Sequence, residues 1–230
     1  MRGREPEVKQ TVSRGLTFVL VSVLACSPAF AFEVVRNVNS PTPPADKVIL
    51  FEKGKGIDHL VFDKRGTCEA ALADDGQLRV HLAGTGECLL NIGWKAGDGR
   101  PEGFSLASYS ALKIVCRVEG SAKVTGRGRN AKVAERGVSE TGGIQLGLKD
   151  AAGLRLWGDS LSTFAADGKN PKETTAILAY FNLFIVPPDG KPSDVRGIQF
   201  RMPPRGREDR DYHIVIERIS LVEKEHADVP

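Results

Sequence analysis

The sequence has no apolar segment long enough to span a bilayer, and it has few aromatic residues. Its longest apolar run, Leu16–Ala25, has ten residues, whereas a membrane helix needs about 20. Aromatic residues make up only 7% of the 230 residues. Few flat side chains therefore remain for ligand contacts once a core has been filled.

The sequence also lacks the short motifs of common enzyme classes. It has no His-Glu-x-x-His, no phosphate-binding glycine loop and no Cys-x-x-Cys. Gly158-Asp159-Ser160-Leu161 resembles the nucleophile block of the GDSL-type esterases, but in those enzymes the block stands near the N-terminus. Asp211-Tyr212-His213 has the wrong spacing for their late Asp-x-x-His, so Ser160 has no general base. We therefore expect a protein that is not an enzyme.

The first 31 residues have the order of a secretory signal peptide. Lys9 and Arg14 precede the apolar run, and Ala29-Phe30-Ala31 supplies a small-x-small cleavage site. We expect cleavage after Ala31 and a secreted or periplasmic protein without a transmembrane segment. The residues before Cys26 also resemble a lipobox, so the alternative is a lipoprotein anchored at Cys26.

The charge of the mature chain excludes one class of partner. Residues 1–31 carry four of the 32 basic and two of the 29 acidic residues, which leaves 28 against 27, a formal net charge of +1. A nucleic-acid-binding domain normally has a basic footprint. We expect no nucleic-acid partner.

The remaining chain has the periodicity of β-strands. Residues 32–47 contain three prolines and predict an extended linker, 48–226 a single domain and 227–230 a tail. Apolar residues alternate with polar ones in about eleven short segments separated by turn residues. This pattern predicts an all-β fold, an antiparallel β-sandwich.

Two local irregularities refine this prediction. In the last strand Ile214 and Ile216 share one face whereas Ile219 and Leu221 share the other, so a bulge at Glu217-Arg218 would return all four to the core. Residues 154–157 should end a strand, with Gly158-Asp159-Ser160 as the turn that follows.

Three cysteines fall on inward positions of the predicted strands: Cys68, Cys88 and Cys116. In an exported protein two of them could form a disulfide. Buried structural thiols fit the pattern equally well, and the spacing matches no metal site.

Short motifs along the domain resemble a known family. Phe51-Glu52-Lys53-Gly54 opens it, Tyr109 with Leu112 marks a middle strand, and Ile216-Glu217-Arg218-Ile219 closes it. These motifs resemble the galactose-binding-like jelly rolls, to which many non-catalytic carbohydrate-binding modules belong. The resemblance implies the same sandwich and a glycan ligand.

The resemblance also implies candidate metal ligands. The family often holds a structural calcium ion between its opening and closing strands, which would assign Glu52 and Glu217 to it, with backbone carbonyls completing the shell. The alternative is that both glutamates are solvated or ion-paired. No cofactor is required.

Glycan recognition in such modules relies on flat aromatic and polar side chains on a concave sheet face or in end loops. The candidates are Trp157 and Tyr180, followed by Tyr109 and His81, whereas Trp94 shares a face with core residues. Two hypotheses remain: an exported glycan-binding module, and a protein-interaction or assembly protein on the same fold.

Overall fold

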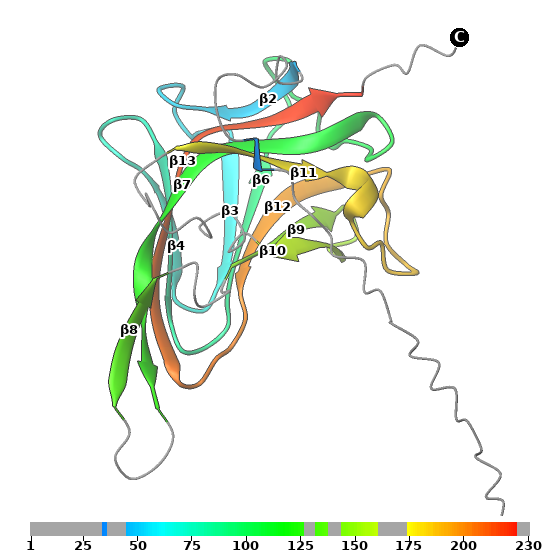
Figure 1. Ribbon diagram of the computed structural model, residues 1–230. Helices are drawn as coiled ribbons and strands as arrows, with labels where there is room; N and C mark the ends of the chain where they lie inside the picture. Colours follow the sequence, from blue (N-terminus) through cyan, green and yellow to red (C-terminus); the bar gives the residue numbers. More distant parts are fainter. Residues whose placement is uncertain (1–33, 36–44, 127–131, 138–143, 161–173, 225–230) are drawn as a thin grey trace, which may run out of the picture.

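Two antiparallel sheets make up the part of the chain that the structure, a computed structural model, describes: residues 34–35, 45–126, 132–137, 144–160 and 174–224 (Figure 1). The first sheet has eight strands, in the order β1-β11-β7-β13-β5-β4, with β2 also paired to β13 and β8 to β7. Its strands are β1 Val34–Val35, β2 Asp46–Glu52, β4 Cys68–Leu72, β5 Leu78–Gly84, β7 Tyr109–Thr125, β8 Val133–Gly137, β11 Thr175–Tyr180 and β13 Glu208–Glu223.

The second sheet has five strands in the order β10-β9-β12-β6-β3. Its strands are β3 Leu60–Arg65, β6 Cys88–Trp94, β9 Gln145–Asp150, β10 Arg155–Ser160 and β12 Val195–Met202. One short 3-10 turn, η2 (Phe181–Leu183), follows β11. The predicted all-β antiparallel sandwich is confirmed.

The core lies between the sheets and follows the alternation of the sequence. Leu78, Val80 and Leu82 of β5 are fully buried, as is Leu90 of β6. Trp94 is also in the core, where its indole N–H donates to the carbonyl of Pro101 at 2.9 Å. Strands such as β5 and β6 therefore have one apolar face toward the core and one outer face.

Strand β13 lies at the centre of the eight-stranded sheet. It pairs with β7 along almost its whole length, and on its other edge it pairs first with β5 and then with β2. The register shifts between Ile216 and Arg218, which confirms the predicted bulge. As expected, Ile214 and Ile216 before the bulge and Ile219 and Leu221 after it are all buried.

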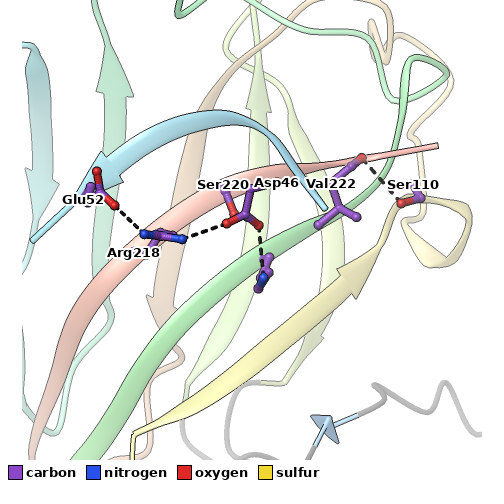
Figure 2. A network of polar contacts seen from close by, with 7 residues as sticks. Asp46, Glu52, Ser110, Arg218, Ser220 and Val222 are labelled. Atoms are coloured by element: carbon purple, nitrogen blue, oxygen red, sulfur yellow. Dashed lines mark hydrogen bonds and ion pairs between the residues drawn. The ribbon is translucent and has the colours of Figure 1, made fainter. Parts of the chain in front are cut away.

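A polar network joins β2 to β13 and β7 on the outer face (Figure 2). Asp46 accepts from Ser220 Oγ at 2.8 Å, from Lys113 Nζ at 3.1 Å and from Arg218 Nη1 at 3.0 Å. Arg218 also pairs with Glu52. Burial alone would raise the pKa of Asp46, but the hydrogen bonds from Ser220, Lys113 and Arg218 outweigh it, so that its pKa is lowered.

Several local predictions differ from the structure. The strands β3 and β8 were not predicted. The expected linker, residues 32–47, contains β1 and the first residues of β2, which begins at Asp46. The turn expected at 158–160 is wrong, because β10 continues to Ser160, where it pairs with Gln145 after a register shift. The segment predicted as one strand from Thr175 to Phe184 ends at Tyr180, where η2 begins.

The three cysteines are buried free thiols, so the disulfide alternative is not what the structure shows. Burial raises the pKa of Cys116 to about 12. Cys26 and the predicted cleavage site lie outside the described residues, as does the tail from 227. No helix among the described residues is long and apolar enough to cross a membrane.

The Asp46 network gives a pH-dependent prediction. Asp46→Asn should lower the free energy of unfolding by about 1 to 3 kcal/mol at pH 7, because charge-assisted hydrogen bonds are lost. Since the folded-state pKa of Asp46 is lowered, its contribution is present above the unfolded-state pKa of about 3.9 and lost as the pH falls through the folded-state value. In urea unfolding from pH 7 down to about pH 3, the difference in the free energy of unfolding between Asp46→Asn and wild type should become smaller.

The control for this variant is Asp189→Asn, which removes an exposed carboxylate that lies outside the Asp46 network. It should leave the free energy of unfolding unchanged at every pH. A difference between Asp46→Asn and wild type that is absent at pH 7, or that stays constant with pH, would contradict the assigned role.

Candidate functional site

A row of polar side chains crosses the outer face of the five-stranded sheet. The register pairs Asp63 of β3 with Asn91 of β6, and Asn91 with Gln199 of β12. The row then continues to Gly147 of β9 and the backbone of Trp157 on β10. The neighbouring residues on these strands point into the core, so this row faces away from it.

Hydrogen bonds fix the orientation of these side chains. Gln199 Nε2 donates to Asn91 Oδ1 at 2.6 Å, and Asn91 Nδ2 donates to Asp63 Oδ2 at 3.1 Å. Lys149 Nζ also contacts Asp63 Oδ2, at 3.4 Å. Each amide donates toward the carboxylate, so the row is an ordered relay with Asp63 as its acceptor end.

The contact between Lys149 and Asp63 shows that this face is concave. Lys149 lies on β9 and Asp63 on β3, three strand spacings apart in the sheet order. In a flat sheet the strands would be about 14 Å apart, and the register offsets the two residues by two further positions along the strands. That distance exceeds what the two outward-pointing side chains and the 3.4 Å contact between them would span. The sheet must therefore curve toward its outer face, and Lys149 reaches across the hollow.

Exposure rises along the row. Gln199 and Asn91 are only 5% and 6% exposed, whereas the side chain of Asp63 is 67% exposed. Gln199 Oε1 is buried and accepts no hydrogen bond. A buried acceptor without a partner costs about 1 to 3 kcal/mol. Solvent does not reach this oxygen, so Asp63 and Lys149 are the groups of the row that a ligand can contact.

Two glycines lie beside the row, one partly exposed and one buried. Gly93 of β6 and Gly197 of β12 are cross-strand partners. A Cβ on either would meet its neighbours only at ordinary contact distances of 3.4 Å or more, so packing does not require glycine there. Glycine inside a strand weakens it and often marks a close approach of a ligand.

Arginine side chains border the other side of the row. Arg155 lies across Gly147, where an added Cβ would come within 2.8 Å of Arg155 Nε. Burial, with repulsion from Arg201, lowers the pKa of Arg155 to about 10. Arg201 donates to Glu87 at 2.7 Å and to Gln145 at 3.1 Å. The border is thus basic, with Glu87 as a counter-charge.

A pocket of about 520 Å³ opens at the end of the sandwich nearest Glu87. The turns at 66–67 and 84–87 line it. Beside it the fully buried Arg210 donates to the backbone carbonyls of Gly84 and Gly86 and of Pro203. Arg210 therefore holds the 84–86 turn in place, and Glu87 belongs to both the pocket and the basic border.

The predicted glycan-contact residues do not lie together. The structure describes only the backbone of Trp157, which the register places in the polar row. Tyr180 ends β11 in the other sheet and packs against Leu178 and Val222. Tyr109 is half-buried, edge-on to Phe104 at 5.9 Å, and His81 lies on the outer face of the eight-stranded sheet. Their contacts with a glycan stay predictions.

The predicted calcium ligands both have protein partners. Glu52 pairs with Arg218, and Glu217 Oε1 accepts from Gln77 Nε2 at 2.9 Å. The carbonyl of Glu217 also accepts from the backbone N–H of Lys53 at 2.8 Å. These contacts match the ion-paired alternative for Glu52, and a calcium ion between the two glutamates stays a prediction.

The polar row was missed because the sequence reasoning looked for aromatic side chains. A usable signal was present: the outward positions of two predicted strands hold Asn91 with Gly93, and Gly197 with Gln199, instead of the charged residues usual on a solvent face. Asp63 could not be assigned, because β3 was not predicted.

The fold and this face define a β-sandwich with a concave polar sheet. No protein-family model matches the chain, and no curated protein matches it. Among solved structures it is similar to a family 11 carbohydrate-binding module from Clostridium thermocellum in complex with a β-1,3-1,4-mixed-linked tetrasaccharide, with 12% identity and a TM-score of 0.42 over 76% of this chain and 95% of that one.

Two further solved structures show the same level of similarity. A family 30 carbohydrate-binding module has 12% identity and a TM-score of 0.35, over 80% of this chain and 91% of that one. An exo-β-agarase has 11% identity and a TM-score of 0.38, over 80% of this chain and 26% of the agarase. Carbohydrate-binding modules are therefore among the structures to which the chain is similar.

The polar row gives a prediction about stability. Gln199→Met removes one hydrogen bond but also an unsatisfied buried acceptor, and these effects are of similar size and opposite sign. The free energy of unfolding in urea should stay within about 1 kcal/mol of wild type. Asn91→Leu is the comparison: it leaves the Gln199 amide without its acceptor and should cost about 1 to 3 kcal/mol. If Gln199→Met lowers the free energy of unfolding more than Asn91→Leu does, this prediction is wrong and the row serves mainly to stabilise the fold.

Proposed function

We propose that this protein is an exported, non-catalytic module that binds a poly- or oligosaccharide on the concave face of the five-stranded sheet. The observation that carries the proposal is the hydrogen-bonded row of Asp63, Asn91 and Gln199. Planar amides and carboxylates held in fixed orientations are suited to hydrogen-bonding sugar hydroxyls. Export rests on the signal-peptide pattern of residues 1–31.

The accessible part of the row is where a sugar would bind. Asp63 and Lys149 would hydrogen-bond its hydroxyls, whereas the buried amides of Gln199 and Asn91 hold Asp63 in its orientation. Gly93, which is partly exposed and has no side chain, leaves room for a sugar ring beside the row. Binding of this kind requires no catalytic nucleophile.

The positions of the candidate catalytic residues support a non-catalytic role. Ser160 ends β10, an edge strand of the five-stranded sheet, whereas Asp211 and His213 lie on β13 in the other sheet. The remaining described histidine besides His81 is His59, whose ring nitrogen contacts the carbonyl of Leu50 at 2.8 Å. Among the described residues, Ser160 is therefore not brought together with a histidine and an acidic residue as a catalytic triad requires.

A polysaccharide screen tests the proposal. Residues 32–230 would be run through native gels containing soluble β-glucan, xylan, agarose or alginate. We expect retardation by at least one of them, and a loss of affinity of at least about tenfold, or 1.4 kcal/mol, in Asp63→Ala and in Lys149→Ala. The matched control is Asp209→Ala with Lys123→Ala, an exposed cross-strand pair on the eight-stranded sheet.

In the same assay, variants of the aromatic candidates show which of the two sheets binds the polysaccharide. Loss of binding in Trp157→Ala with retention in Tyr180→Ala would agree with the proposed face, and the reverse would contradict it. Binding to no polysaccharide at all would support the alternative function, a protein-interaction or assembly module.

A further inference from the structure

Two histidines and an aspartate meet on the outer face of the eight-stranded sheet, on the opposite side of the sandwich from the polar row. His81 of β5 and His213 of β13 are direct cross-strand partners. Asp211 stands two residues before His213 and therefore on the same face. The intervening Tyr212 and the following Ile214 are fully buried, which fixes this face as the outer one.

The three side chains bring one ligand atom each close together. Asp211 Oδ1 is 2.7 Å from His81 Nε2 and 3.3 Å from His213 Nε2. The two imidazole rings are stacked with centroids 4.4 Å apart and planes only 4° from parallel. One donor atom from each residue lies within 4.8 Å of both others. The histidine side chains are 36% and 41% exposed, so solvent reaches the spot.

We propose that His81, Asp211 and His213 form a binding site for a divalent transition-metal ion, with zinc as the representative. In tetrahedral zinc, bonds of about 2.0 to 2.1 Å place the ligand atoms about 3.3 Å apart. The observed separations from Asp211 are 2.7 and 3.3 Å. Because the two rings are stacked nearly parallel, they must rotate out of the stack for both nitrogen lone pairs to meet at one ion. Three protein ligands leave a fourth position open to water or to a group from outside.

The donor set selects the class of ion. Imidazole nitrogen with a single carboxylate suits zinc, copper, nickel or iron(II), whereas calcium and magnesium prefer shells made of oxygen. This site is therefore distinct in place and chemistry from the calcium site predicted at Glu52 and Glu217.

The surrounding charges favour a cation. Glu69 of β4 is the cross-strand partner of His81, and Glu119 of β7 is that of His213. Arg117 pairs with Glu119, and Arg79 occupies the same face two residues before His81. Together with Asp211, three carboxylates face two guanidinium groups, which leaves the cluster with net negative charge when both histidines are neutral.

The test is a zinc titration of the tag-free chain, residues 32–230, in competition with a chromophoric chelator. We expect saturable binding of one Zn²⁺ per chain. His81→Gln and His213→Gln should each weaken it at least about tenfold, and the double variant should abolish it. His59→Gln, which removes a histidine outside the cluster, is the control and should bind as wild type does.

Two further measurements keep the result unambiguous. Urea unfolding of each variant in chelator should match that of wild type, because the substituted side chains lie on the outer face. Cobalt(II) bound in place of zinc should show no thiolate-to-metal charge-transfer band, since the cysteines are buried elsewhere. The absence of saturable binding, binding unchanged in the double variant, or a thiolate band would each overturn the proposal.

Discussion

Strand β13 changes pairing partner at one bulged residue, and the rest of the sandwich depends on that change. Before the bulge β13 pairs with β5, and after it with β2, while β7 continues along its other edge. The extra residue is Glu217, whose carbonyl binds the N–H of Lys53 and whose carboxylate binds Gln77. Without the bulge, a two-residue side-chain period would turn either Ile214 and Ile216 or Ile219 and Leu221 toward water.

The bulge also decides what appears on the outer face of that sheet. Ahead of it the outward positions hold Asp211 and His213, next to His81 of β5. Beyond it they hold Arg218 and Ser220, which bind Asp46 of β2. One strand thus supplies a cluster of metal-ligand type at one end and a structural ion-pair network at the other. The face proposed to bind a glycan is built entirely on the second sheet.

The sequence predicted much of the fold because strand periodicity is local. Alternation in β5, β6 and β12 located these strands, and the split pattern of the isoleucines in β13 located the bulge. The strand β3 was missed because its sequence does not alternate: three apolar residues, 60–62, are followed by three charged residues, 63–65. The strand β8 is short, and its described residues are exposed, which leaves it no apolar face to signal a strand.

The candidate site was predicted less well, for a different reason. Asp63, Asn91 and Gln199 lie on β3, β6 and β12, and their meeting depends on a register between strands that are distant in sequence. A single sequence shows which residues face outward but not which outward residues become neighbours. His81 was identified as a functional candidate, yet its partner His213 is 132 residues away, and only the pairing of β5 with β13 brings them together.

The central claim is that the concave face of the five-stranded sheet binds sugar. The most direct measurement is an NMR titration that follows the side-chain amide signals of Asn91 and Gln199 as fragments of the polysaccharide that retards the protein most are added. The account predicts saturable shifts of both amides, while the side-chain amide of Gln77 on the eight-stranded sheet stays in place. Shifts confined to the eight-stranded sheet, with Asn91 and Gln199 unchanged at saturation, would contradict it.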